Sequence, residues 1–319
     1  EEIEVGASTT VEGLRVWFKQ YRGGEEFAFE GLGSSQLDIE LKQDGEDTSL
    51  NFIGTFSDIY AGKGGFLAKS GGMGIRGAVE LSEKGWLADG RLDMSDAELT
   101  VDGPSDTSFL VHAQEMNAAL PFRIASYELS SSGNSRSGML SFGTLKAFGL
   151  SAVDVELPVK LYDNVFALES SLTLSRERGK VVVSPFRVES VTLDSRSTVA
   201  DIAFDHIDTR NVAGEFGIDA FEGDVDGEYT VSLAEGRFDI EGSGVLTAFG
   251  GDISFGSFYF VAGKYPEFGF DRIEFHDVDL LLMTEPFEDI AASISGNIRG
   301  YIRDFKWSYG SPSAFRVWI

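Results

Sequence analysis

Apolar and polar residues alternate with a period of two along most of the chain. In MGIRGAVEL (73–81), every second residue is apolar or glycine, and the residues between them include Arg76 and Glu80. Such alternation is typical of β-strands, because successive side chains point to opposite faces of a sheet. The pattern recurs roughly every 8–12 residues and predicts an all-β protein of about eighteen strands.

Tight turns separate neighbouring strands. The Asp-Gly pair of QDGED lies between LDIEL (37–41) and LNFIGTF (50–56), and it accepts the positive φ of a hairpin turn. Two further hairpin turns are predicted at Asp163-Asn164 and at Arg178-Gly179. These signals favour antiparallel pairing between strands that follow one another in the chain.

The alternation shifts parity in two places. In FRVESVTLDS the shift indicates a β-bulge at Ser190, where one extra residue re-aims the following side chains. A second shift separates Ile302 from Phe305. Helix is predicted only in one or two short segments, of which 279–289 is the best, with Asp279 as its N-cap.

Two strands place glycines on their apolar parity. In ISGNIRGYI (294–302), Gly296 and Gly300 alternate with isoleucines, and Gly223 and Gly227 hold the matching positions of GDVDGEY. Glycine weakens a strand interior and often marks the close approach of a backbone or a ligand. The similarity indicates either one structural module used twice or coincidence in a chain rich in glycine.

Composition supports a large β protein. The chain has 319 residues with 42% hydrophobic content, 38 Gly against 7 Pro, 26 Phe, and no Cys. A chain of this length is long enough for either one large all-β unit or two ordinary domains. We expect a single extended β-sheet unit over residues 1–319, with a subdivision into 1–150 and 151–319. The absence of Cys excludes disulfides and thiolate metal sites.

The charge balance disfavours nucleic acid and anionic membrane surfaces as partners. With 52 acidic and 26 basic residues, the net charge is −26, which repels nucleic acid and anionic membrane surfaces. No apolar run approaches the roughly 20 residues of a membrane-spanning helix. Because the sequence starts and stops abruptly, we expect it to be part of a longer protein.

Catalytic and metal-binding motifs are not recognisable. His112, His206 and His276 have no metal-ligand spacing. Acidic stretches such as DIAFDHIDTRN lack the regular spacing of a calcium loop, and no carboxylate pair stands out for glycoside hydrolysis. The sequence therefore predicts no enzyme, no metal and no cofactor.

The aromatic residues near position 255 permit two interpretations. Ile253 and Phe255 share one parity of GGDISFGSFYF, whereas Phe258 and Phe260 share the other. One interpretation is a sheet buried on both faces, or a bulge at Gly256-Ser257, as in a β-sandwich core. The other is a long sheet whose concave face stays apolar in order to hold an apolar ligand. The pattern alone leaves both open.

Three segments of the C-terminal third share a family pattern: LTAFGGDISFGSFYF (246–260), FGFDRIEFHDVDL (268–280) and SGNIRGYIRDF (295–305). They resemble the C-terminal region of the AsmA-like superfamily, most closely its YdbH and TamB type. In that family an AFGG-like turn leads into paired strands, and a Gly-x-Leu-x-Gly strand opens the next hairpin. The resemblance is to degenerate motifs, none of which is catalytic.

The resemblance implies a lipid-transport function. Family members are inner-membrane-anchored envelope proteins of diderm bacteria that carry phospholipid across the periplasm along a hydrophobic β-groove. It therefore implies an elongated, twisted and curled antiparallel-rich sheet, with a half-pipe groove that passively carries phospholipid acyl chains. The inner-membrane anchor and an outer-membrane partner protein are expected outside this segment. The alternative is a β-sandwich or β-solenoid adhesin module with a filled core.

The expected groove lining consists of apolar residues within 151–319. They are Leu172, Leu174, Val181, Val183, Phe238, Ile240, Ile253, Phe255, Ile294, Ile298 and Ile302. Four glycines are expected to shape the groove: Gly223, Gly227, Gly296 and Gly300. They provide curvature or room for an acyl chain, or they accommodate the protein's own aromatic side chains, such as Trp307.

Overall fold

The computed structural model confirms the all-β class. Almost every described residue lies in a strand, most neighbouring strands are antiparallel, and helix is limited to short segments. The structure describes residues 2–12, 15–19, 26–31, 34–44, 47–63, 66–83, 85–102, 109–125, 137–147, 149–162, 165–189, 197–210, 222–234, 237–261, 267–284, 295–308 and 311–318.

Two compact units divide the chain. The first contains Glu1–Ala147 and Ser151–Ser170, and the second contains Phe148–Leu150 and Ser171–Ile319. The division thus falls about one hairpin later than the boundary after residue 150 that the sequence suggests, because the strands following residue 150 pair within the first unit.

The first unit contains eleven labelled strands. They are β1 (Glu2–Glu12), β2 (Arg15–Lys19), β3 (Glu26–Gly31), β4 (Ser34–Asp44), β5 (Asp47–Lys63), β6 (Phe66–Ser82), β7 (Gly85–Asp102), β8 (Phe109–Ala125), β9 (Ser137–Ala147), β10 (Leu150–Tyr162) and β11 (Val165–Leu168).

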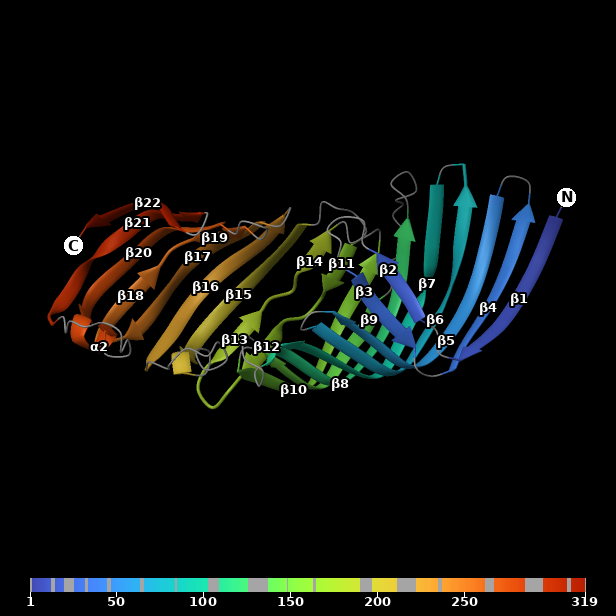
Figure 1. Cartoon of the computed structure of the whole chain (residues 1–319), viewed down its shortest axis with the longest axis horizontal. Coiled ribbons are helices and arrows are strands. Elements are labelled where there is room, and N and C mark those ends of the chain that lie inside the picture. Colours follow the sequence, from blue (N-terminus) through green and yellow to red (C-terminus); the bar gives the residue numbers. More distant parts are fainter. Residues whose placement is uncertain are drawn as a thin grey trace. The chain divides into compact units, whose positions relative to one another are not determined.

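Strands β4 to β9 of the first unit pair in chain order, each antiparallel to the next (Figure 1). The pairing of Asp44 with Asp47 confirms the hairpin predicted around the Asp-Gly pair, and that of Tyr162 with Val165 confirms the next one. One short parallel pairing joins β10 to β8.

Acidic residues interrupt the long strands of the first unit. Asp58, Asp96 and Glu115 have positive φ angles of 50°, 49° and 52° in the interiors of β5, β7 and β8. Asp is enriched at positive φ because its short polar side chain tolerates the left-handed region. Figure 1 shows these strands, which are 17 and 18 residues long, curving along their length.

The second unit contains the remaining elements. They are β12 (Leu172–Ser175), β13 (Lys180–Val183), β14 (Arg187–Glu189), β15 (Ser197–Asp208), β16 (Gly223–Ala234), β17 (Arg237–Ala248), β18 (Gly251–Phe255), β19 (Phe258–Val261), β20 (Glu267–Asp279), α2 (Leu280–Thr284), β21 (Asn297–Ser308) and β22 (Ser311–Trp318).

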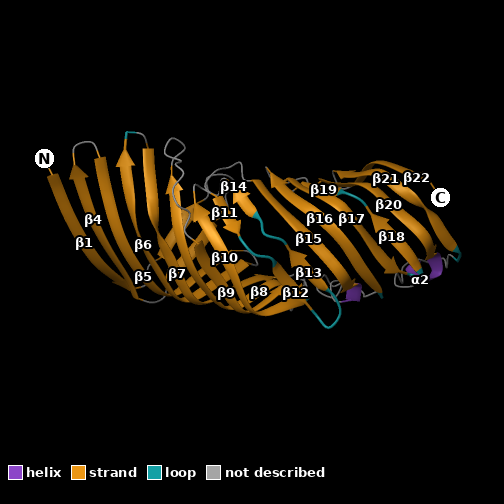
Figure 2. Cartoon of the chain, turned by 180° about the vertical axis from the view of Figure 1, so that it is seen from behind, coloured by secondary structure: helices purple, strands orange, loops and turns teal. Residues whose placement is uncertain are grey.

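Strands of the second unit also follow one another side by side (Figure 2). The antiparallel order runs β13, β15, β16, β17, then β18 and β19 end to end, then β20, β21 and β22. The turn predicted at Arg178-Gly179 is confirmed, with Gly179 at φ 86°. The bulge predicted at Ser190 lies outside the described residues.

The one helix with an assigned range, α2, follows its predicted cap. Oδ1 of Asp279 accepts a hydrogen bond from the Leu281 backbone N–H at 2.8 Å, which satisfies one of the unpaired donors at the helix start. Beside it lies a core cluster of buried side chains on the same sheet face: Leu246, Ala248, Ile253 and Val278.

Candidate functional site

One face of the second unit carries aligned apolar side chains. Directly opposed residues of antiparallel strands share a face, so the register defines two rows that cross several strands. The first row is Ile240, Phe258, Phe270 and Phe305. The second row is Phe238, Phe260, Phe268 and Trp307.

The aromatic rings within these rows pack against one another. Phe270 and Phe305 stack with centroids 4.7 Å apart and planes 5° from parallel. Phe268 stacks on Trp307 with centroids 5.9 Å apart. Aromatic pairs of this kind stabilise a sheet by about 0.5–1.5 kcal/mol beyond the area they bury. The rows therefore stabilise this face locally.

A crease crosses the sheet beside the aromatic rows. In β17 the register against β18 and β19 differs by one residue, near Gly242 at φ 155°. Gly256 and Ser257 separate β18 from β19, and their backbone bonds to β20 are Gly256 N–H to Arg272 O at 2.9 Å and Asp271 N–H to Ser257 O at 3.0 Å. Such irregularities bend strands and increase local twist, which curves this face.

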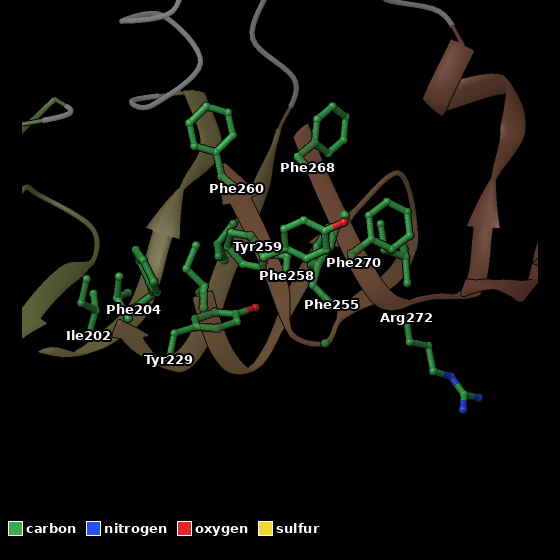
Figure 3. Close-up of a pocket in the computed structure, with 16 residues that line it drawn as sticks. Ile202, Phe204, Tyr229, Phe255, Phe258, Tyr259, Phe260, Phe268, Phe270 and Arg272 are labelled. Carbon is green, nitrogen blue, oxygen red and sulfur yellow. The ribbon is translucent and has the colours of Figure 1, made fainter. Parts of the chain in front are cut away.

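An apolar groove of about 650 Å³ lies at the crease (Figure 3). Its lining comes from β15 to β20 and is almost entirely aliphatic and aromatic. Phe258, Phe260 and Phe268 remain 41–42% exposed there. This volume is in the usual range for small-molecule sites, which are mostly apolar. Full burial of a Phe side chain is worth about 1.5–3 kcal/mol, so these rings gain stability from an apolar ligand.

The opposite face carries charges. Tyr259 donates a hydrogen bond to Glu267 at 2.9 Å, and Glu267 pairs with Lys306 at 2.9 Å. The Lys306 ammonium is the main cause that lowers the pKa of Glu267, and Glu267 in turn raises the pKa of Lys306. Arg237 lies 4.3 Å from the Tyr259 ring centroid. The sheet is thus amphipathic in this region, with ionised groups directed to water.

Several predicted lining residues lie at or beside the groove. Ile240 and Phe255 line it directly. Phe238 pairs with Phe260 across β17 and β19, and Ile302 pairs with Ile273 across β21 and β20. These four predicted side chains share the groove face.

Four predicted residues of β12 and β13 extend the same face. Val183 is opposite Ile202, and Val181 is opposite Phe204, so they adjoin two groove residues. On β12, Leu172 pairs with Val183 and Leu174 pairs with Val181. Leu174 and Val181 are 7% and 9% exposed, so little of their surface is accessible to a ligand.

Two other predicted residues belong to the core cluster. Ile253 is 6% exposed and packs with Leu246 and Val278, and Ile298 packs against that cluster. Phe249 and Met283 pack there too, so the protein's own side chains cover this end of the face. Ile294 lies outside the described residues.

The four glycines have different surroundings. A Cβ on Gly227 would lie 3.0 Å from the Tyr229 ring, so the room beside it is filled by the protein's own aromatic side chain. A Cβ on Gly223 would lie 2.8 Å from that of Ala248. Gly300 is buried opposite Phe275. Gly296 precedes β21 with φ 123° and is not part of that strand.

The sequence prediction missed most of the aromatic lining. These residues are Phe204, Tyr229, Phe258, Phe260, Phe268 and Phe270. Phe258 pairs with Ile240, and Phe255 pairs with Gly244 of β17, and the register of β17 shifts by one residue between these two pairs, so both parities of 253–260 reach one face. One signal in the sequence was available. In Phe270-Asp-Arg-Ile273, two polar residues and not one separate the apolar positions, which indicates that the strand changes parity there.

The histidines do not belong to the groove lining. His206 Nδ1 lies 2.7 Å from Asp205 Oδ1 and 3.2 Å from Asp226 Oδ1, and these carboxylates raise its pKa. His112 Nδ1 is 3.2 Å from the Thr100 hydroxyl, and His276 is 3.3 Å from Glu274. The Asp205, His206 and Asp226 group is exposed and ion-paired, which accounts for its geometry.

Comparison with protein-family models, curated proteins and solved structures finds no match for this chain. Across the residues that the structure describes, none of the helices has both the length and the apolar character needed to cross a membrane.

Proposed function

We propose that this chain binds phospholipid acyl chains in the apolar groove of its second unit and carries them passively. The chains lie on the aromatic face while the head groups remain in water. In the full-length protein, an inner-membrane anchor and an outer-membrane partner place this segment in the periplasm, on a route between the two membranes. No covalent step and no cofactor take part.

The observation that carries the proposal is the group of exposed aromatic side chains in the groove. Phe258, Phe260 and Phe268 keep 41–42% of their surface open, although the neighbouring core cluster is buried. A β-sandwich with a filled core would cover such residues with a second layer of its own side chains. An acyl chain supplies the missing apolar contact. The sequence resemblance to AsmA-like proteins supports the same ligand class.

Lipid capture from vesicles tests the proposal. The purified chain is incubated with phosphatidylcholine vesicles, separated from them, extracted with organic solvent and analysed by mass spectrometry. We expect bound phospholipid in the wild-type protein. Phe260→Asp combined with Phe268→Asp should lower it at least about tenfold, because each change removes an apolar contact and adds a charge that resists burial.

A matched control separates the groove from the surface. Val199 is 52% exposed and alternates with the groove-face residues of β15, so Val199→Asp places an aspartate on the other face and is compared with each single groove variant, Phe260→Asp and Phe268→Asp. It should leave lipid capture unchanged. Circular dichroism and urea unfolding check that all variants retain the sheet. Equal lipid in the groove variant and the wild type, or none in either, would contradict the proposal.

A further inference from the structure

Tyr229 brings a hydroxyl group to the otherwise apolar groove. The backbone at Tyr259 and Arg272 borders the groove, but both polar side chains are bonded on the opposite face: the Tyr259 hydroxyl donates to Glu267 at 2.9 Å, and Arg272 pairs with Glu274. Among the described residues, the Tyr229 hydroxyl has no protein hydrogen-bond partner. It is therefore the available donor within the groove.

The position of the Tyr229 ring is fixed by its neighbours. Phe204 and Phe258 contact it edge to face, with centroid separations of 6.1 and 5.7 Å (Figure 3). The ring also lies against a glycine surface: a Cβ on Gly242 would be 2.9 Å from its Cδ1, and one on Gly244 would be 2.6 Å from its hydroxyl. This packing limits the directions in which the hydroxyl can donate.

The Tyr229 hydroxyl is protonated at physiological pH. Desolvation raises the pKa of Tyr229 above the ordinary tyrosine value of 10.0, so the group remains a neutral donor at physiological pH. In the empty groove, water can accept its hydrogen bond. When a ligand displaces that water, a purely hydrocarbon segment leaves the donor unsatisfied, which is unfavourable, whereas an acceptor on the ligand restores the bond.

We infer that Tyr229 donates a hydrogen bond to an ester carbonyl of the bound lipid and thereby selects ester-linked acyl chains over ether-linked alkyl chains. The inference rests on the proposed function and adds the chemical linkage that the groove recognises. An ester carbonyl is the polar group closest to the hydrocarbon of an acyl lipid. An ether-linked lipid has the same head group and chain length but lacks this acceptor.

A competition between the two linkages tests the inference. The wild-type chain is incubated with vesicles that contain equal amounts of diester and diether phosphatidylcholine with chains of equal length, and the captured lipids are quantified by mass spectrometry. We expect about threefold to tenfold enrichment of the diester lipid, as for one net hydrogen bond. Tyr229→Phe keeps the ring and should capture both lipids equally.

Tyr259→Phe is the matched control, because the Tyr259 hydroxyl is bonded to Glu267 on the charged face. This variant should retain the preference. As a second measurement, a ¹³C-labelled ester carbonyl should show a lower infrared frequency when bound to wild type than to Tyr229→Phe. Capture of both lipids by wild type without a preference, and with no frequency shift, would overturn the inference. Capture of neither lipid would instead overturn the proposed function.

Discussion

Two strand pairs of the second unit, β15–β16 and β20–β21, share the same local architecture. In β15 the register shifts between Phe204 and Ile207, and in β20 it shifts between Phe275 and Val278. At each shift, two polar residues between two apolar ones stand opposite a single residue of the partner strand, so one extra residue is inserted. As a result, the side chains of Ile207 and Val278 lie on the buried face of the sheet. They are 4% and 0% exposed, respectively.

Backbone details of the two bulges also correspond. His206 and Asp277 occupy the left-handed region, with φ angles of 51° and 57°. In both cases the preceding hairpin approaches closely at a glycine. A Cβ on Gly179 would lie 2.2 Å from the carbonyl oxygen of His206, and one on Gly251 would lie 2.4 Å from that of His276. Both glycines therefore permit a close backbone approach at the bulge, at carbonyls that differ by one position between the two modules.

Aspartates end both strands. Asp208 accepts the Arg210 backbone N–H at 3.0 Å, and Asp279 accepts the Leu281 backbone N–H at 2.8 Å. The glycine pattern seen in the sequence starts at the first residue of β16 and one residue before β21. Within it, Val225 pairs with Ile207 and Ile298 pairs with Val278. These matches favour one structural module used twice over a coincidental similarity.

The two modules differ in which strand carries the acidic residue and which the basic residue of the cross-strand pair. In the first, His206 contacts the carboxylate of Asp226 on β16 at 3.2 Å. In the second, Asp277 accepts a hydrogen bond from Arg299 on β21 at 2.7 Å. The acid and the base have exchanged strands while the bulge is retained. The buried apolar residue and the backbone therefore define the module, whereas the exposed ion pair can be varied.

The largest expected effect comes from the buried residue behind each bulge. Ile207→Ala should lower the free energy of unfolding by about 2–5 kcal/mol, and Val278→Ala by about 2 kcal/mol, because each leaves a cavity. Urea unfolding at pH 7 measures both. Val199→Ala, an exposed change on the other face, should cost no more than about 0.5 kcal/mol. If Ile207→Ala and Val278→Ala also lowered the free energy of unfolding by no more than about 0.5 kcal/mol, the buried residue would not define the two modules.

A smaller effect is expected from the two aspartate caps. Asp208 also binds the Arg210 guanidinium, at 2.7 Å from Oδ2 to Nη2, and this contact is the main cause that lowers its pKa. Asp208→Ala should therefore cost about 1–2 kcal/mol, and Asp279→Ala about 0.5–1 kcal/mol. The stabilisation that the Asp208 carboxylate provides should be complete above the ordinary Asp pKa. It should decline as the pH falls through the lowered pKa that Asp208 has in the folded protein.

Unfolding curves at pH 7 and at pH 3 measure this difference. Asn at either position can still accept the backbone N–H, so Asp208→Asn and Asp279→Asn serve as controls that keep the cap but remove the charge. Asp208→Asn should lose more stability than Asp279→Asn, because Arg210 then lacks its carboxylate. Equal losses would show that the arginine contact adds nothing to the first cap.

Local patterns in the sequence predicted the strands and hairpins but not the full groove lining. Alternation and turn residues determine these elements over a few positions, and the Asp279 cap was recognisable for the same reason. Ile253 was predicted to line the groove, yet it packs in the core because Val278 and Leu246 reach it from neighbouring strands. That arrangement depends on long-range register, which irregularities such as the one in β17 near Gly242 change.

The smallest expected effect is a pH dependence at the cross-strand charge pair of the first module. His206 faces Asp205, Asp226 and Asp224, and Lys180 pairs with Asp205. The carboxylates raise the pKa of His206, so its ion pairs stabilise the fold fully below the ordinary histidine pKa of 6.5 and are lost as pH rises through the higher folded value. At the equivalent pair the second module has a carboxylate and a guanidinium, Asp277 and Arg299, and no imidazole.

NMR titration of the His206 ring measures this effect directly. The midpoint should lie above 6.5 in the wild-type protein and move toward 6.5 in Asp226→Asn. The double variant His206→Asp with Asp226→Arg gives the first module the charge arrangement of the second, so local stability should become independent of pH between 6 and 9. Aspartate suits the left-handed backbone at position 206, so the exchange tests charge without disturbing the bulge. An unchanged midpoint in Asp226→Asn would mean that the cross-strand carboxylate does not hold the imidazolium, and that the polarity exchange between the modules has no energetic consequence.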